Sequence, residues 1–85
     1  MTLETLRHQV DRIDSKLLQL LSRRASLVVR IGEIKKKHGL PVYDGKRELE
    51  VLARLMRSNA GPLSKKAIRS IFSAVLRHSR KLQDS

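Results

Sequence analysis

The stretch LQLLSRRASLVVRIGEIKKK, residues 18–37, ends the longest amphipathic pattern in the chain. Counted from the N-terminus, apolar residues recur at alternating intervals of about three and four, the spacing of one face of an α-helix. They are Leu3, Leu6, Val10, Ile13, Leu17, Leu20, Leu27, Ile31 and Ile34. The series requires one further apolar residue at position 24, but Arg24 stands there. A permanently charged guanidinium therefore falls on the predicted core face.

Two breaks divide the chain into three predicted helices, at about residues 3–37, 45–59 and 64–83. Gly39 can adopt the left-handed conformation that ends a helix, and Pro41 prevents its continuation. Asp44 and Ser64 are suited to cap the second and third helices, because their side-chain oxygens accept hydrogen bonds from free backbone N–H groups. No β-type alternation of useful length appears, so the chain is predicted to be all-α.

The first predicted helix is long relative to the rest of the chain. A helix over residues 3–37 is about 52 Å long, whereas the other two span about 24 and 30 Å. Two short helices cannot cover such a face, and a single domain over residues 1–85 would gain from a partner. We therefore predict an intertwined helical homodimer in which the long helices pair and the shorter ones pack across. Parallel and antiparallel pairing both remain open.

Composition argues against several classes of protein. The chain has no cysteine, and its three histidines have no fitting carboxylate cluster, so we expect no metal site. No apolar run approaches the roughly 20 residues needed to span a bilayer, and the N-terminus lacks the layout of a signal peptide. We expect a soluble, cytoplasmic protein that does not bind a membrane.

Lys and Arg number 19 against 8 Asp and Glu, a formal net charge of +11. Such an excess first suggests nucleic acid. However, the basic residues are spread along the chain, and Tyr43 and Phe72 are too few aromatics for a base-stacking platform. We expect no nucleic-acid binding. The excess charge could steer an anionic substrate or mark a surface for an acidic partner, and the sequence does not choose between them.

Further polar residues fall on the predicted apolar faces. Lys35 returns to the face of Arg24 about 16 Å further along the helix, and Ser79 and Gln83 continue the apolar stripe of the third helix. Arg7 lies about 25 Å before Arg24 on the same helix. It can therefore approach the same small ligand only from the other chain of an antiparallel dimer.

Two simpler interpretations of these residues stay open. Arg24 could be neutralised by Asp14 or Glu48, and Lys35 could face solvent because it opens a run of lysines. Together, however, several donors with few acids on a helical core face indicate a pocket for a compact anion such as a carboxylate. No nucleophile–base motif or Gly-rich phosphate loop is present. An enzyme of this sequence would act by positioning and electrostatics.

Three segments carry a resemblance to a known family. They are LRHQVDRIDSKLLQLLSRRASLVVRIGEIKK, PVYDGKRE and IFSAVLRHSRKLQ, which together cover nearly the whole chain. The sequence resembles the all-α chorismate mutases, whose small chains form intertwined helical homodimers with two shared active sites. The resemblance implies the Claisen rearrangement of chorismate to prephenate, without cofactor or metal. It also implies a place in the shikimate pathway of aromatic amino acid biosynthesis.

The resemblance further implies which residues bind the substrate carboxylates. Arg24 and Arg7 of the partner chain match the carboxylate clamps, and Arg47 and Ser79 match further positions on the carboxylate side. Lys35 matches a residue that reaches both a carboxylate and the ether oxygen.

The remaining matches concern the ether oxygen and the ring hydroxyl. Gln83 matches the second donor to the ether oxygen. Glu48 resembles the acceptor for the ring hydroxyl, helped by the backbone at Asp44. Because a glutamine donates without taking up a proton, we expect activity at neutral pH without a sharp acid optimum.

Two alternatives to this function are an isochorismate-pyruvate lyase of the same fold and a non-catalytic helical dimerisation or regulatory module. The Arg47–Glu48 pair favours the mutase, and a pure scaffold would gain by replacing Arg24 with leucine. The chain could be a free enzyme or a domain fused to, or docked on, another shikimate-pathway enzyme.

Overall fold

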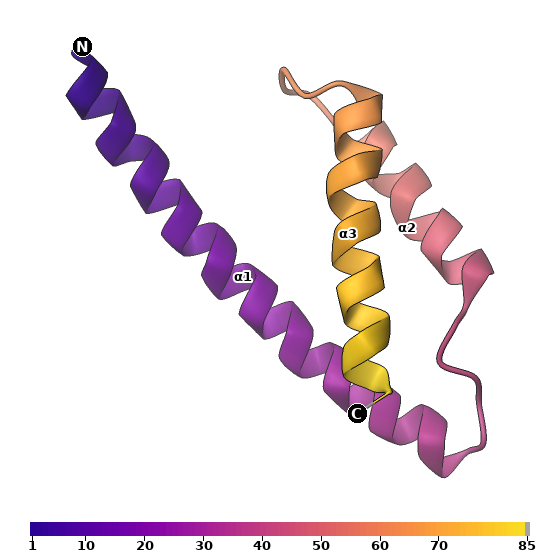
Figure 1. Ribbon diagram of the computed structural model, residues 1–85. Helices are drawn as coiled ribbons and strands as arrows, with labels where there is room; N and C mark the ends of the chain where they lie inside the picture. The colour runs from indigo at the N-terminus through magenta and orange to yellow at the C-terminus, as the bar shows by residue number, and fades with distance from the viewer. Residues whose placement is uncertain (85) are drawn as a thin grey trace.

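A computed structural model describes residues 1–84, and all regular secondary structure within them is helical. The helices are α1 (Leu3–Lys37), α2 (Gly45–Arg57) and α3 (Lys65–Gln83). In Figure 1, α1 is a long arm, the C-terminal end of α3 crosses the C-terminal half of α1, and α2 packs against α3. The predicted all-α fold with one long N-terminal helix is confirmed.

The predicted helix caps are present. The side chain of Asp44 accepts a hydrogen bond from the backbone N–H of Arg47, and that of Ser64 accepts one from Ala67. Gly39 has a φ of 67°, a left-handed conformation that a side chain would strain. These local signals fix where α1 ends and where α2 and α3 begin.

The second helix ends at Arg57, earlier than the predicted residue 59. Two side chains bind the backbone where the helix ends. The Ser58 hydroxyl donates to the carbonyl of Arg54 at 2.9 Å, and the Asn59 amide donates to the carbonyl of Leu63 at 2.6 Å. The Ser58 hydroxyl bond accompanies the helical bond from the Ser58 N–H to the same carbonyl, whereas the Asn59 side chain, which also accepts from the N–H of Gly61, turns the chain here.

The core is small and lies along α3, which packs against both α1 and α2. Its buried apolar residues are Val28 of α1, Val51 of α2, and Ile68 and Leu76 of α3. The described chain measures 54 × 23 × 15 Å, an elongated shape set by the free N-terminal part of α1.

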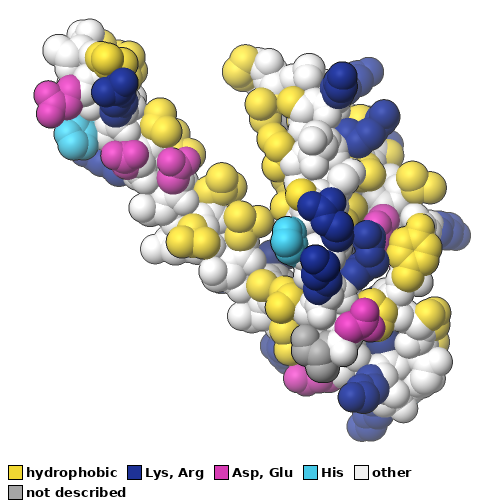
Figure 2. Space-filling model, viewed as in Figure 1, with side chains coloured by type: hydrophobic (Ala, Val, Ile, Leu, Met, Phe, Trp, Pro, Cys, Tyr) yellow, Lys and Arg dark blue, Asp and Glu magenta, His cyan; other side chains and the backbone are white. Residues whose placement is uncertain are grey.

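The apolar face of α1 is largely uncovered. Every residue of the stripe predicted from the sequence is between 42% and 65% exposed. Figure 2 shows hydrophobic side chains along the projecting arm. Neither α1 nor any other described helix is long and apolar enough to cross a membrane.

Candidate active site

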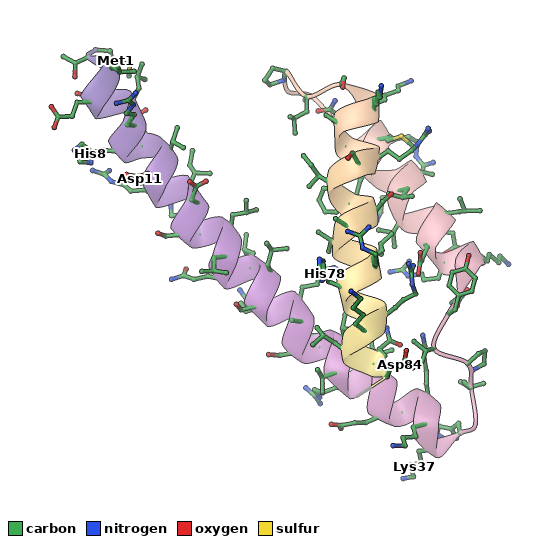
Figure 3. The ribbon with its side chains drawn as sticks, viewed as in Figure 1. Met1, His8, Asp11, Lys37, His78 and Asp84 are labelled. Carbon is green, nitrogen blue, oxygen red and sulfur yellow. The ribbon has the colours of Figure 1, made fainter. Side chains whose placement is uncertain are left out.

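The polar residues singled out in the sequence converge where the C-terminal end of α3 crosses α1 and faces the start of α2. A cleft of about 140 Å³ lies there, near the end of α3 that Asp84 marks in Figure 3. Its polar lining consists of Arg24, Lys35, Asp44, Arg47, Glu48, Ser79, Arg80 and Gln83. All predicted site residues except Arg7 are thus brought together, and Arg80 is added to them.

A larger hollow of about 290 Å³ lies beside this cleft, between α1 and α3. Apolar side chains dominate its lining, and only Arg24 and Ser79 are shared with the cleft. We assign the candidate active site to the smaller cleft, because Lys35, Arg47, Arg80 and Gln83 add their donors there to those of Arg24 and Ser79, whereas the hollow adds only His78.

Arg24 projects from α1 towards α3. Its Nη1 donates a hydrogen bond to Oγ of Ser79 at 2.5 Å, and that hydroxyl donates to the carbonyl of Val75 at 2.8 Å. Among the described residues, neither Asp14 nor Glu48 forms an ion pair with Arg24, and Glu48 pairs with Arg80 instead. Neutralisation of Arg24 by either of them within the chain, one of the simpler interpretations, is therefore wrong. A guanidinium has five N–H donors, and the Ser79 hydroxyl orients it without consuming most of them.

Lys35 and Gln83 form a pair across α1 and α3. The Lys35 ammonium donates to the backbone carbonyl of Val42 at 2.9 Å and to Oε1 of Gln83 at 2.9 Å. Because a lysine can only donate, it selects the oxygen of the Gln83 amide and leaves the amide NH₂ group facing elsewhere. The pair therefore retains one N–H of Lys35 and the NH₂ of Gln83 as donors for a ligand. Lys35 is half-buried, so the interpretation of a freely solvated lysine is wrong.

Gly32 allows this pair to form. It is buried on α1 where the end of α3 crosses, and a Cβ there would lie 2.9 Å from the Cα of Gln83. Only a residue without a side chain permits that approach of two backbones.

Glu48 and Arg80 form an ion pair that joins α2 to α3. Nη1 of Arg80 lies 2.5 Å from both carboxylate oxygens of Glu48, and its guanidinium carbon lies 5.6 Å from the ring centroid of Tyr43. The hydrogen bonds that Arg80 donates to Glu48 raise the pKa of Arg80 above its already high usual value, so the guanidinium stays charged.

Sequence reasoning missed Arg80 because it follows Ser79 directly and falls beside the apolar stripe of the third helix. One signal could have found it. Arg80 lies three residues before Gln83 and four after Leu76, and residues at these intervals share a helix face.

Asp44 and Arg47 lie at the rim of the cleft. The Asp44 carboxylate caps α2, while the Arg47 side chain is 63% exposed and stands 3.8 Å from Glu50. Within residues 1–84, no group of three or more His, Asp or Glu side chains is placed to hold a metal ion. Four cationic side chains (Arg24, Lys35, Arg47 and Arg80) and two carboxylates (Asp44 and Glu48) line the cleft.

Arg7 does not line this cleft. It lies near the N-terminus of α1, about 25 Å along the helix from Arg24, on the part of the arm that leaves the other helices. A role for Arg7 at the cleft thus requires a second copy of the chain.

Comparison with known proteins identifies relatives over nearly the whole chain. Residues 6–84 match the family described as chorismate mutase type II. The structure is similar to a chorismate mutase (form II) from Thermus thermophilus, with a TM-score of 0.94 and 42% identity, covering 95% of this chain and 92% of that one. It is also similar to a chorismate mutase from Helicobacter pylori in complex with prephenate, with a TM-score of 0.89 and 34% identity, covering 96% and 89%.

Some relatives are much longer proteins. The bifunctional chorismate mutase/prephenate dehydratase of Aquifex aeolicus is 39% identical over 89 residues, which include 95% of this chain but 25% of that protein. For the next two curated relatives the chain spans 21% of their length.

Proposed function

The chain belongs to the chorismate mutase type II family, and on that premise we propose that it converts chorismate to prephenate. The observation that carries this proposal is the convergence of Arg24, Lys35 and Gln83 on one cleft, each held by a contact that leaves N–H donors unused. Such a cleft suits a small dianion whose negative charge shifts during the reaction.

The reaction is an intramolecular rearrangement. The ether C–O bond of chorismate breaks while a C–C bond forms between the enolpyruvyl methylene and the ring, and no atom enters or leaves. The protein therefore needs no nucleophile. It must hold the substrate in its reactive, folded conformation and stabilise the negative charge that grows on the ether oxygen.

We assign the carboxylates of the substrate to Arg24, Arg47 and Ser79, together with Arg7 of a second copy. Ser79 also positions Arg24 through its hydroxyl. Cations on both carboxylates fix the distance between the reacting carbons, which converts binding energy into orientation.

The ether oxygen is assigned to Lys35 and Gln83. Their mutual hydrogen bond fixes both side chains before the substrate arrives, so little reorganisation accompanies the reaction. Donors to this oxygen bind the transition state more tightly than the ground state, and only that difference accelerates the reaction. Glu48, aided by the backbone at Asp44, accepts the ring hydroxyl.

The uncovered stripe of α1 supports a homodimer as the active form. Apolar residues that are about half exposed along a helix of this length would be stabilised by burial against a second α1. That copy would also deliver Arg7. The bifunctional Aquifex relative further supports fusion to, or docking on, another enzyme of the same pathway as a context for this chain.

The decisive experiment is to incubate the purified chain with chorismate at neutral pH and follow its absorbance. Prephenate is identified after acid conversion to phenylpyruvate. Formation of prephenate supports the proposal. Isochorismate is tested in parallel, and release of pyruvate from it would instead indicate the lyase. A folded dimer that converts neither chorismate nor isochorismate would indicate a non-catalytic module.

A further inference from the structure

Arg80 lies inside the cleft, yet the proposed chemistry gives it no role. Its side chain is 33% exposed and that of Glu48 is 21% exposed, so the ion pair between them is partly buried. Both residues line the same cleft as Lys35 and Gln83. The proposed chemistry therefore leaves the position of this partly buried guanidinium unexplained.

The contacts of Arg80 join three separate parts of the chain. Arg80 belongs to α3. Its guanidinium binds the carboxylate of Glu48 on α2 and lies over the ring of Tyr43 in the loop between α1 and α2. Tyr43 in turn lies against the start of α2, where a Cβ at Gly45 would meet its hydroxyl at 2.7 Å. The guanidinium is thus held from two sides, and it holds Glu48 in turn.

The charges of the cleft explain why such a contact is useful. A dianionic substrate must bind beside the Glu48 carboxylate, and like charges a few ångströms apart in a partly buried site repel each other more than they do in bulk water. Arg80 compensates the Glu48 charge locally. With it, four cationic side chains (Arg24, Lys35, Arg47 and Arg80) face two carboxylates in the lining.

The geometry leaves Glu48 able to accept another hydrogen bond. A carboxylate has about four lone-pair sites, and Nη1 of Arg80 contacts each oxygen once. The remaining sites can take a hydroxyl from the substrate, in an orientation that Arg80 has already fixed.

We propose that Arg80 is a positioning residue for substrate recognition, holding Glu48 as an oriented, charge-compensated acceptor for a hydroxyl group of a dianionic substrate. This inference rests on the proposed function. The contact that Arg80 supports stabilises the ground state and the transition state equally. Its loss should therefore raise KM more than it lowers kcat.

The test replaces Arg80 by methionine, which keeps an unbranched apolar stem, and by lysine, which keeps only the charge. Arg80→Met should raise KM about tenfold, the loss expected for one charge-assisted contact, and leave kcat within about threefold. Arg80→Lys should recover part of the loss. The matched control is Arg77→Met, an exposed arginine of α3 outside the cleft, which should change neither constant.

A double mutant separates action through Glu48 from direct contact with the substrate. In a Glu48→Gln background, Arg80→Met should change KM by less than about twofold, because this background lacks the carboxylate through which Arg80 acts. An undiminished loss in that background would overturn the inference and make Arg80 a direct ligand. An unchanged KM in Arg80→Met alone, or an equal effect of Arg77→Met, would also overturn it.

Binding measured without turnover keeps this inference distinct from the proposed function. Calorimetric titration of each protein with prephenate should show the same tenfold weakening for Arg80→Met and none for Arg77→Met. If the wild-type chain binds prephenate in this pattern but does not convert chorismate, the catalytic proposal fails and the role of Arg80 stands. If the wild-type chain converts chorismate and all variants bind prephenate equally, the catalytic proposal stands and the role of Arg80 fails.

Discussion

Gly32 of α1 and Gln83 of α3 meet backbone to backbone: a methyl group on Gly32 would lie 2.9 Å from the Cα of Gln83 and 3.1 Å from its Cβ and Cγ. The obstacle is partly backbone, so rotation of a side chain cannot relieve it. The same crossing places Gln83 beside Lys35. The position of one candidate catalytic amide therefore depends on the absence of a side chain one turn before Lys35.

Gly32→Ala should consequently displace the end of α3. We expect kcat to fall by up to about a hundredfold, because a shift of about 1 Å in a catalytic group has that effect. The overpacked crossing should also cost about 1–3 kcal/mol in the free energy of unfolding. Steady-state kinetics and urea denaturation measure the two effects.

The matched control is Gly61→Ala. Gly61 lies in the exposed turn between α2 and α3, where a Cβ would meet nothing closer than 3.9 Å. It should leave both kcat and stability unchanged. Full activity of Gly32→Ala would contradict the role assigned to this crossing.

Removal of a central cation should have a larger effect. Arg24→Ala and Lys35→Ala should each lower kcat/KM about a thousandfold or more, since each loses a donor that is already oriented towards the ligand. Their helical circular dichroism should remain. Arg23→Ala, an exposed neighbour outside the cleft, serves as the control. Near-normal activity in either cleft variant would show that the site lies elsewhere.

The helices were predictable from the sequence because their signals are local. Asp44, Ser64 and Gly39 act on backbone groups within a few residues, and each occupies the cap or turn expected of it. The end of α2 was placed two residues too late because the Asn59 side chain binds the backbone of Gly61 and Leu63 and turns the chain before Gly61 and Pro62 are reached.

The contacts within the site were not predictable in the same way. Periodicity places Arg24 and Ser79 on the inner faces of their helices, but it does not say that one binds the other. The Glu48–Arg80 pair depends on how α3 lies against α2, and the side chain of Arg80 crosses from the edge of its stripe to reach it. Such pairings depend on how two helices cross, which the periodicity of a single helix does not determine.

The uncovered face of α1 predicts the effect of a charge placed on it. Leu17 is 53% exposed in the single chain and lies in the middle of the stripe. Leu17→Glu should weaken the dimer at least about a hundredfold, because each of two copies loses the burial of one leucine. Activity should fall with it. Ser15→Glu, on the opposite side of α1, should leave the dimer intact, and sedimentation at several concentrations compares the two. A wild-type chain that sediments as a monomer at every concentration would contradict the dimer.

Gln83→Glu tests the requirement for a neutral donor. A glutamate must be protonated to donate a hydrogen bond, and the neighbouring Lys35 ammonium favours its ionised form. At neutral pH we expect kcat to fall about a hundredfold or more. Because Lys35 holds the pKa of this glutamate below its ordinary value of about 4.3, kcat should rise again only as the pH falls below about 4. The wild-type chain should show no such rise. A variant that is fully active at neutral pH would exclude donation by this side chain.

Complementation between chains tests whether the site is shared. Arg7→Ala and Arg24→Ala homodimers should both be nearly inactive, because every site lacks one clamp. When the two chains are unfolded together and refolded, half of the dimers should be mixed, and each mixed dimer contains one site with both arginines intact. The mixture should then recover about a quarter of wild-type activity. If Arg7 and Arg24 served the same site from one chain, every site of the mixed dimer would lack one arginine and no activity would return. Differently tagged chains, purified by both tags in turn, allow the mixed dimer itself to be assayed, and about half of wild-type activity is expected from it.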